Sequence, residues 1–358
     1  MMLRALFPWF KRSALGHRQF ATPGLHSVEE MRRILDRERM RSDRGGVPFS
    51  LLAIRLPRTE IMEDGLPRLA AVLRGRLRLT DDAGYLPDGR IGVSLSATPV
   101  SGAWRLAEDI SALMSGDEDL LVFEVYVYPS ERWLTEDADH TQREREHGRQ
   151  ERSLEPLFMR PLPAWKRAVD VVGAVAGLIM LLPAMLVAGL AIKATSPGPV
   201  LFSQWRTGAG GRKFKLYKFR SMCVDAEQRK AALRHRSEQD GPAFKLRGDP
   251  RITPVGQFLR SSCVDELPQL WNVLKGDMSL VGPRPLPCDE SRGCDAWHRR
   301  RLDVTPGLTC TWQVSPFRVA FAEWMRMDIR YSSRRHIAQD VKLLFQTLLR
   351  VVRFRASH

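Results

Sequence analysis

The sequence predicts a mixed α/β protein of two domains, a small α/β domain followed by a mainly helical domain that begins with a long apolar helix. Its 358 residues exceed one ordinary core, and 44% hydrophobic with 27% charged residues is typical of folded protein. Residues 161–358 hold 32 of the 56 Lys and Arg but only 16 of the 41 Asp and Glu, so the net charge of +15 lies there. An apolar run over residues 168–192 stands near the start of this basic half.

The first domain is predicted over residues 23–135, after an N-terminal arm of residues 1–22 whose apolar patch is too short for a secretory signal. Ser27 followed by Glu30 has the spacing of a capping box and predicts a helix start. Downstream, the hydrophobic pattern predicts a strand at 49–56, a helix at 66–78, a hairpin at 85–95, a helix at 102–114 and a strand at 120–128.

This order of elements resembles nucleotidyl-cyclase-like domains of the diguanylate cyclase type. Their GG(D/E)EF signature is absent from the hairpin, which reads YLPDGRIGV. The resemblance implies a degenerate cyclase-like α/β domain with a regulatory or scaffolding role. Residues 136–160 carry dense mixed charge without apolar periodicity, and we expect them to form a solvated linker.

The second domain, residues 161–358, begins with an apolar run that is long enough to span a bilayer. Pro183 lies in the middle of the run and is expected to break or kink a helix. Lys166 and Arg167 flank one end and Lys193 the other, so the positive-inside rule places both ends in the cytoplasm. These features predict a re-entrant membrane helix broken at Pro183, with a straight anchoring helix that tolerates a proline as the alternative.

The excess of basic residues predicts an anionic partner, such as an acidic membrane surface or phosphorylated substrates. Paired zinc-finger spacing and a leucine-zipper basic region are absent from the sequence, so we expect no nucleic-acid partner. The five cysteines are an odd number without a metal-binding spacing, which favours reduced thiols in a cytosolic setting.

Two cations on one predicted strand are candidates for phosphate binding. Residues 213–220 alternate apolar and basic side chains, and Gly208, Gly210 and Gly211 before them predict a tight turn. Lys218 and Arg220 then lie on the same face of the strand. A pair of fixed cations suits a diphosphate, and it also suits anionic lipid headgroups.

A short helix is predicted over residues 266–275, where Leu267, Leu270, Trp271 and Leu274 fall on one face and Gly276 is placed as a C-cap. Pro268 fits its first turn, so Asp265 and Glu266 lie at the N-terminal end. One interpretation is structural, with Asp265 as N-cap and Glu266 complementing the helix dipole.

The other interpretation of this acidic pair is chemical. A helix N-terminus keeps a carboxylate ionised and attracts a phosphate toward it, so a nucleophile and its target meet in one place. The neighbouring carboxylate can then hold Mg²⁺ against the phosphate oxygens. Arg284 stands between Pro283 and Pro285, which stiffen the backbone around its guanidinium. A stiffened arginine near two carboxylates favours phosphoryl-transfer chemistry.

Several motifs in a fixed order are similar to the bacterial sugar transferases, the monotopic polyprenyl-phosphate phosphoglycosyl transferases. They are KRAVD, the apolar run, GPVLFSQWRTG, FKLYKFRSM, DPRITPVGQFLR, DELPQLWNVLKGDMSLVGPRP, RRLDVTPGLTCTWQVS and DIRYS, over about residues 165–349. The resemblance implies that Asp265 attacks the sugar-side phosphate of a UDP-sugar, releasing UMP, and that undecaprenyl phosphate then accepts the phosphosugar. It further implies Mg²⁺ at Asp265 and Glu266, and phosphate contacts from Lys218, Arg220, Arg251, Arg284 and Arg318, with Arg300 and Arg301 as further candidates.

The same resemblance implies a place at the cytoplasmic face of the bacterial inner membrane, contact with anionic lipids, a homodimer, and a role in starting exopolysaccharide or other surface glycan synthesis. Three positions depart from the family pattern. Leu182 stands where a serine often precedes the proline, and Cys310 and Pro316 replace glycines. None of these changes touches Asp265 or Glu266.

Two rival hypotheses stay open on the sequence. One is a non-catalytic membrane regulator or scaffold that binds anionic lipid, and the other is a single-span sensor with an external N-terminal domain. The C-terminal residues Ile337, Val341, Leu344, Leu348 and Val352 share one helical face. That face is expected either to lie on an acidic membrane surface or to pack on the core.

Overall fold

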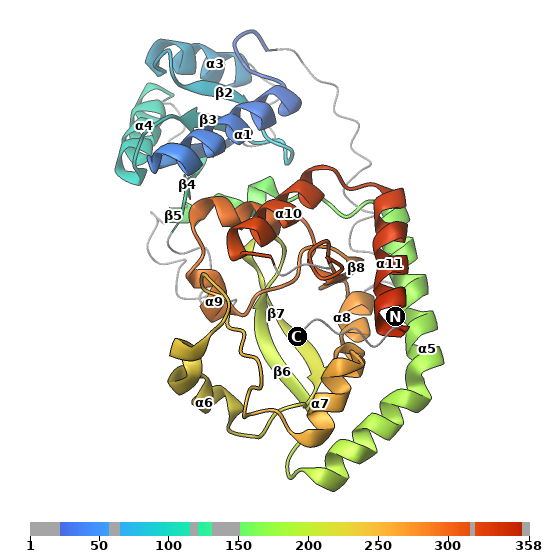
Figure 1. Cartoon of the computed structure of the whole chain (residues 1–358). Coiled ribbons are helices and arrows are strands. Elements are labelled where there is room, and N and C mark those ends of the chain that lie inside the picture. The colour runs from blue at the N-terminus through green and yellow to red at the C-terminus, as the bar shows by residue number, and fades with distance from the viewer. Residues whose placement is uncertain (1–21, 57–64, 115–120, 131–150, 316–318, 353–358) are drawn as a thin grey trace. The chain divides into compact units, whose positions relative to one another are not determined.

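The computed structural model describes residues 22–56, 65–114, 121–130, 151–315 and 319–352. The chain divides into two compact units, Met1–Phe158 and Met159–His358 (Figure 1). Both units combine helices with strands, so the predicted mixed α/β class is confirmed.

The first unit has the element order that the sequence predicts. Its elements are α1 (Val28–Gly45), β1 (Phe49–Arg55), α3 (Gly65–Arg76), β2 (Asp82–Tyr85), β3 (Ile91–Leu95), α4 (Val100–Leu113), β4 (Val122–Tyr128), β5 (Glu151–Ser153) and the 3₁₀ turn η4 (Glu155–Phe158). Ser27 caps α1 in a capping box with Glu30, as predicted. β2 and β3 pair antiparallel as the expected hairpin.

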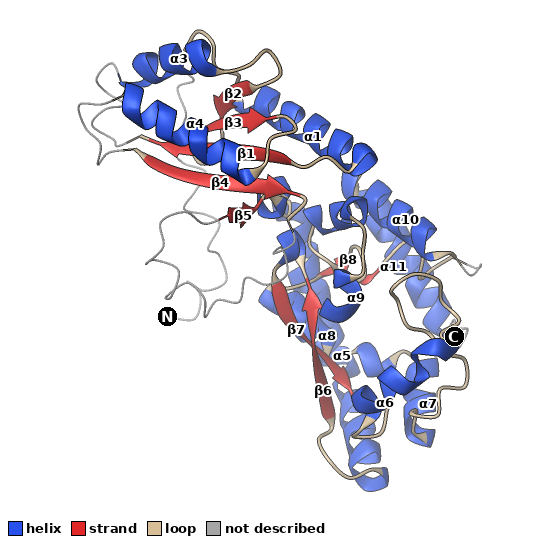
Figure 2. Ribbon diagram, turned by 90° about the vertical axis from the view of Figure 1, so that its left-hand side faces the viewer, coloured by secondary structure: helices blue, strands red, loops and turns tan. Residues whose placement is uncertain are grey.

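The first unit is built around a five-stranded sheet in the order β2-β3-β1-β4-β5 (Figure 2). Leu69 of α3 and Ile110 of α4 belong to the apolar cluster on one face of this sheet, and Met31 of α1 belongs to the cluster on the other face. Both faces are therefore covered, which explains why six consecutive residues of β1 are buried.

The segment that we expected to be a solvated linker is structured in its described part. β5 pairs parallel with β4, and Leu154 and Phe158 belong to the same apolar cluster as Tyr128. The burial of these two apolar side chains explains why this part of the predicted linker is ordered. In the sequence, the charged residues around them hide this apolar pair. The rest of the predicted linker, residues 136–150, lies outside the described residues.

The second unit is mainly helical around two small sheets. Its elements are α5 (Ala164–Thr195), β6 (Leu201–Thr207), η5 (Ala209–Gly211), β7 (Lys213–Phe219), α6 (Ala226–Leu233), η6 (Arg234–Arg236), α7 (Pro254–Ser261), η7 (Val264–Glu266), α8 (Gln269–Lys275), β8 (Ser279–Val281), α9 (Cys288–Arg292), η8 (Ala296–Asp303), β9 (Gly307–Thr309), α10 (Phe321–Ser333) and α11 (Ile337–Val352). β6 and β7 form an antiparallel hairpin, and β8 pairs parallel with β9 (Figure 2).

Helix α5 contains the whole apolar run and is long and apolar enough to cross a membrane. The helix is continuous through Pro183, so the expected break is not a gap in the helix. Pro183 still cannot donate a hydrogen bond to the Ile179 carbonyl, which is the ordinary cause of a helix kink. The ribbon of α5 bends in its lower part in Figure 1.

The residues that flank the apolar run bind α5 to the rest of its unit. Lys166 forms a buried ion pair with Asp340 of α11, and Asp170 accepts hydrogen bonds from the Ser279 hydroxyl and the Leu280 N–H, both at 2.9 Å. Arg167 donates to the Val273 and Leu274 carbonyls at the end of α8. Lys166 and Arg167, two of the cations from which we inferred the membrane topology, therefore also stabilise the fold.

Candidate active site

The acidic pair lies in a 3₁₀ turn, not in the first turn of the helix that we predicted. Asp265 and Glu266 belong to η7, whereas α8 starts only at Gln269 and Pro268 is its N-cap. Cys263, just before η7, has φ +58°, a left-handed conformation that ends α7 and turns the chain. The dipole of α8 therefore does not account for the electrostatics of the acidic pair. The cations around the pair account for it.

Helix α8 holds this turn against the β6–β7 hairpin. The Asn272 amide donates to the Lys215 carbonyl at 2.7 Å and accepts from the Tyr217 N–H at 3.1 Å. Gly276 ends α8 in the left-handed conformation, as predicted. Leu270 and Val273 are buried, but Trp271 is 54% exposed, so the expected apolar face of this helix is only partly packed.

Glu266 accepts hydrogen bonds from two cations that come from different elements. The Lys218 ammonium of β7 donates to Oε1 at 2.7 Å, and the Arg284 guanidinium donates to both carboxylate oxygens. Burial alone would raise the pKa of Glu266, but Arg284 and Lys218 outweigh it and hold that pKa well below its usual range. Glu266 is therefore a fixed anion.

Asp265 differs from its neighbour in its surroundings. Its side chain is buried, with the residue 6% exposed, and burial raises its pKa to about 6 although Lys218 acts to lower it. Arg260 and Arg284 also lie close enough to favour its ionised form. The site thus pairs a carboxylate that is held ionised with one whose pKa is raised toward neutral, a contrast that is typical of functional sites.

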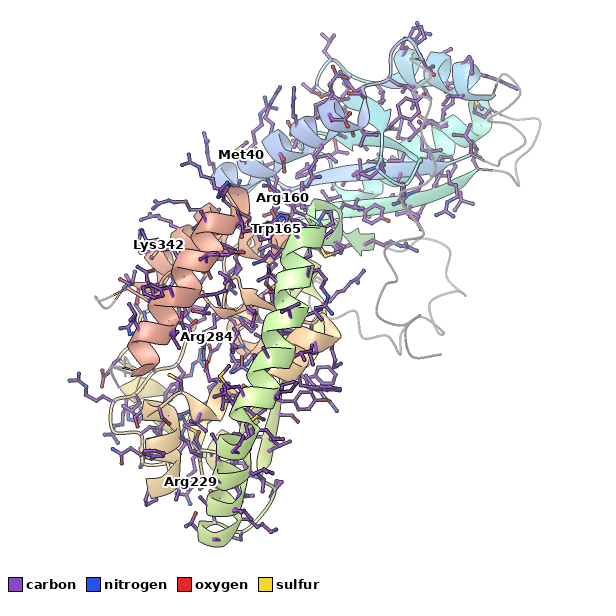
Figure 3. All side chains as sticks on the ribbon, turned by 90° about the vertical axis from the view of Figure 1, so that its right-hand side faces the viewer. Met40, Arg160, Trp165, Arg229, Arg284 and Lys342 are labelled. Carbon is purple, nitrogen blue, oxygen red and sulfur yellow. The ribbon has the colours of Figure 1, made fainter. Side chains whose placement is uncertain are left out.

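Two further arginines hold the backbone that carries Arg284. Arg206 of β6 donates to the Pro285 carbonyl at 2.9 Å, and Arg301 donates to the carbonyl of Arg284 itself. Arg301 is in turn paired with Asp328 at 2.9 Å, and both side chains are buried. Figure 3 labels Arg284 within the second unit. The proline-flanked segment is therefore fixed at two consecutive carbonyls.

Glycines allow the backbones of this region to come together. A Cβ on Gly307 would lie 2.0 Å from the Gly282 nitrogen, so β8 and β9 can pair here only because both residues lack side chains. Gly282 begins the segment with Arg284, and the close approach places that segment against β9. The glycines of the GPRP and PGLT motifs thus have a packing reason.

The structure brings together four of the predicted site residues, namely Asp265, Glu266, Lys218 and Arg284. It places Arg220 and Arg251 on protein acceptors instead. Arg220 donates to the Ser196 and Pro197 carbonyls beyond the end of α5, which satisfies a helix C-terminus. Arg251 pairs with Asp249 and donates to the Ala226 carbonyl. These contacts indicate structural roles for both.

The other candidates lie elsewhere. Arg301 supports Arg284 from behind through its carbonyl, as described above. Arg318 lies outside the described residues. Reasoning from the sequence missed Arg206 and Arg260, although Arg206 sits in the FSQWRTG motif and Arg260 lies five residues before Asp265. Their closeness to the acidic pair depends on α7 and the β6–β7 hairpin meeting η7, for which the sequence holds no local signal.

The site offers oxygen donors of the kind that Mg²⁺ prefers. Among the described residues no group of three or more His, Cys, Asp and Glu side chains converges. A pair of carboxylates is nevertheless sufficient where substrate phosphates and water complete the shell of the ion. The five cysteines are all free, as expected for reduced thiols.

A buried aspartate and a half-buried glutamate surrounded by cations, near a helix long and apolar enough to cross a membrane, form an arrangement that suits phosphate chemistry. The family described as bacterial sugar transferase matches residues 162–354. The chain therefore belongs to the bacterial sugar transferase family, as its motifs predicted.

Curated relatives match the same part of the chain. It is 44% identical over 192 residues to a galactosyl transferase, CpsE, from Streptococcus agalactiae, covering 51% of this chain and 41% of the relative. It is 39% identical over 209 residues to a UDP-N-acetylgalactosamine-undecaprenyl-phosphate N-acetylgalactosaminephosphotransferase from Aeromonas hydrophila, covering 55% and 46%. The chain thus spans less than half the length of these two relatives.

A third relative is covered further. The chain is 39% identical over 198 residues to a UDP-glucose:undecaprenyl-phosphate glucose-1-phosphate transferase from Caulobacter vibrioides, covering 51% of this chain and 68% of the relative. Among solved structures, a GGDEF domain from Pseudomonas aeruginosa matches 37% of this chain and 92% of its own, with 22% identity and a TM-score of 0.28. The cyclase-like character of the first unit stays a prediction.

Proposed function

We propose that this protein transfers a sugar phosphate from a UDP-sugar to undecaprenyl phosphate and releases UMP, in the first step of the synthesis of a surface glycan. The observation that carries the proposal is the contrast within the acidic pair. Glu266 is held as an anion by Lys218 and Arg284, while Asp265 is buried with a pKa raised to about 6. The names of three relatives, each an undecaprenyl-phosphate or galactosyl transferase, support the reaction class.

In the first step, a carboxylate oxygen of Asp265 attacks the sugar-side phosphorus of the donor. A phosphorus–oxygen bond forms to Asp265, the bond to the bridging oxygen breaks, and UMP leaves with the electron pair of that bond. Arg284 and Lys218 lie beside the acidic pair, where they stabilise negative charge on the phosphate oxygens. The product of this step is an aspartyl-phosphosugar.

In the second step, a phosphate oxygen of undecaprenyl phosphate attacks the same phosphorus. The bond to Asp265 breaks, so the carboxylate is regenerated and undecaprenyl-diphosphate-sugar leaves. A buried Asp265 suits this step because few water molecules reach the intermediate to hydrolyse it. Overall, the sugar phosphate moves from UMP to the phosphate of the lipid carrier.

We propose Mg²⁺ as the cofactor, with Asp265 and Glu266 as the residues that hold it. When bound, the ion neutralises phosphate charge as a Lewis acid. The donor type fits, because both side chains are carboxylates and a neighbouring diphosphate supplies further oxygens. Glu266 already accepts from Lys218 and Arg284, so it shares its oxygens among these cations.

We further propose that α5 is a re-entrant membrane helix at the cytoplasmic face of the bacterial inner membrane. Its length, its exposed apolar side chains and Pro183 support this placement. The topology is tested with single cysteines placed in the first unit of a chain whose five native cysteines are changed to serine. A membrane-impermeant maleimide added from the periplasmic side should leave them unlabelled, and labelling would instead favour a single-span sensor.

The reaction is tested with the membrane-bound protein, Mg²⁺ and a panel of UDP-sugars, by measuring UMP release. We expect one sugar to give release, Asp265→Asn to abolish it, and mass spectrometry to find a phosphosugar on Asp265 when the lipid acceptor is omitted. Release that persists in Asp265→Asn would contradict the mechanism. The absence of release with every sugar would favour the non-catalytic membrane scaffold.

A further inference from the structure

Arg206 lies on the same face of the β6–β7 hairpin as Lys218. The two strands form the hairpin of Figure 2, and in their register Phe202 stands opposite Lys218 while Arg206 stands opposite Phe214. Directly opposed residues share a face of a sheet, and so do residues two and four apart in one strand. The two cations are therefore on one face, near its two ends.

The end of β6 runs beside the segment that carries Arg284. Arg206 forms an isolated antiparallel bridge with Pro287, and its Nη1 donates to the Pro285 carbonyl at 2.9 Å. These contacts fix the guanidinium of Arg206 within electrostatic range of Arg284 and Glu266. Lys218 and Arg206 therefore approach the acidic pair from opposite ends of the hairpin face.

The described residues satisfy the guanidinium of Arg206 only in part. Its Nη1 bonds the Pro285 carbonyl, its Nε is buried without a hydrogen-bond partner, and it forms no ion pair within the described ranges. A guanidinium offers five N–H donors, and a buried donor without a partner costs free energy. The side chain thus has both charge and donors available for a ligand.

The carboxylates of α9 do not fill this gap. Glu290 lies close enough to favour the charged form of Arg206, but it accepts from the Lys230 ammonium at 3.2 Å and from the Phe244 N–H at 3.4 Å. Asp289 accepts from the same ammonium at 2.9 Å. Because Lys230 takes the hydrogen bonds of both acids, the charge of Arg206 has no direct partner.

Positive charge gathers around the acidic pair. Burial lowers the pKa of Arg206 to about 10, and the like charge of Arg284 acts in the same direction. Burial also lowers the pKa of Lys218, and Arg284 and Arg206 add to this effect although Glu266 opposes it. Like charges held this close repel one another unless an anion lies between them. The arrangement is typical of a site that binds phosphate groups.

We propose that Arg206 binds the distal phosphate, meaning the one on the far side of the reacting phosphorus from Asp265. The role rests on the proposed function, in which Lys218 and Arg284 bind the phosphate that is attacked. Arg206 is then the cation available to the next phosphate of the donor. When the bond to the bridging oxygen breaks, its electron pair stays with UMP, whose phosphate gains one negative charge. A guanidinium beside that phosphate stabilises the developing charge.

The distal phosphate occupies one position in both steps of the reaction. The attacking and leaving oxygens lie roughly in line, so UMP leaves on the side opposite Asp265. In the second step Asp265 is the leaving group, and the lipid phosphate attacks from the side that UMP has left. The phosphate of UMP and the phosphate of the lipid therefore use Arg206 in turn.

The assignment is tested by calorimetric titration of the full chain in phosphatidylcholine nanodiscs with UMP and with uridine, which lacks the phosphate. Arg206→Gln removes the charge but keeps an amide that can donate to the Pro285 carbonyl, whereas Arg206→Lys keeps the charge. We expect Arg206→Gln to weaken UMP binding at least tenfold and uridine binding less than twofold. Arg206→Lys should weaken UMP binding less than fivefold.

Arg212→Gln is the matched control, because it removes an exposed cation just before β7, at the turn of the same hairpin. It should change the binding of UMP and of uridine by less than twofold. Equal losses of UMP and uridine in Arg206→Gln would show that Arg206 only holds the backbone. Unchanged UMP binding in that variant would likewise overturn the proposal.

Two measurements on the unmodified chain do not depend on the folding of a variant. UMP should slow the modification of Arg206 by phenylglyoxal at least fivefold more than uridine does, as followed by peptide mass spectrometry. Farnesyl phosphate, a short prenyl phosphate, should displace UMP, since both use the distal position. Equal protection by UMP and uridine would refute the assignment of Arg206, and the absence of displacement would refute the shared position.

The proposed function and this inference can fail separately. If no UDP-sugar gives UMP release, the proposed function fails, while the binding of UMP and its protection of Arg206 still decide the role of this residue. If UMP is released and Arg206→Gln binds UMP as tightly as the unmodified chain, the proposed function stands and the role of Arg206 is refuted.

Discussion

Two cations that stand two residues apart, Lys218 near the end of β7 and Arg220 just after it, make different contacts. Lys218 reaches the carboxylate of Glu266, whereas Arg220 binds the carbonyls of Ser196 and Pro197 beyond the end of α5. Both alternate onto the same face of the strand, so the sequence pattern treats them alike. The difference teaches that a cation of this segment reaches the acidic pair only where no nearby backbone carbonyl takes its hydrogen bonds.

The same contrast separates the two arginines of the DPR and GPRP motifs. Arg251 is saturated by Asp249 and by the Ala226 carbonyl, while the guanidinium of Arg284 faces the acidic pair. Arg284 is free to do so because its own backbone is held from behind by Arg301 and, at the next residue, by Arg206. Arg206 and Arg301, which hold the backbone, and Arg284, which contacts the acidic pair, are thus different residues of one network.

The largest expected effect on catalysis follows from replacing Arg284. Arg284→Ala removes a charged donor from the phosphate site, and kcat/KM for UMP release should fall about 10²- to 10³-fold. Arg284→Lys keeps the charge without the two-pronged geometry and should recover only part of the loss. The measurement is initial-rate kinetics in nanodiscs, with circular dichroism as the folding control. A loss below threefold in Arg284→Ala would remove this residue from the site.

A second expected effect concerns the support behind Arg284. Asp328→Asn leaves the buried Arg301 without its ionic partner, and about 3 kcal/mol of unfolding free energy should be lost. Because Arg301 then holds the Arg284 carbonyl less firmly, kcat should also fall, by about tenfold, with a smaller change in KM. Denaturant unfolding and steady-state kinetics test this. A variant that loses stability with unchanged kcat would show a structural role alone.

The pH profile tests the contrast within the acidic pair. Burial raises the pKa of Asp265 to about 6, and only its ionised form attacks phosphorus. We therefore expect kcat/KM to fall about tenfold per pH unit below 6 and to level off above 7. The pKa of Glu266 is held low, so it should add no step in this range. A plateau that extends down to pH 5 would contradict the assignment of Asp265.

The raised pKa has a further consequence for stability. Asp265 binds its proton more tightly in the folded chain than in the unfolded one, where its pKa is near 3.8. Its contribution to stability is therefore complete below about pH 4 and is lost as the pH rises toward 6. Asp265→Asn removes this penalty, so we expect a higher unfolding temperature than the unmodified chain at pH 7.5 and little difference at pH 4. Differential scanning calorimetry at both values decides it.

Local signals explain how much of this molecule could be predicted from its sequence. The capping box at Ser27 and the glycine that ends α8 act within a few residues, the apolar run of α5 is one continuous stretch of sequence, and the structure has all three. The family motifs also brought Lys218, Arg284 and the acidic pair together correctly. Contacts far apart in the chain could not be predicted. Arg220 binds a carbonyl 24 residues away, and Asp340 pairs with a lysine 174 residues away.

The smallest expected effect on catalysis is at Arg220, and it sharpens the opening contrast. Arg220→Met keeps the length of the side chain but leaves the Ser196 and Pro197 carbonyls without their donor. We expect an unfolding free energy lower by about 1–3 kcal/mol, since two part-buried carbonyls lose charged hydrogen bonds. The folded fraction should keep kcat/KM within about threefold, whereas Lys218→Met should lower kcat/KM at least tenfold with little change in stability. Reversed results for the two variants would show that the strand holds its phosphate ligand at Arg220 instead.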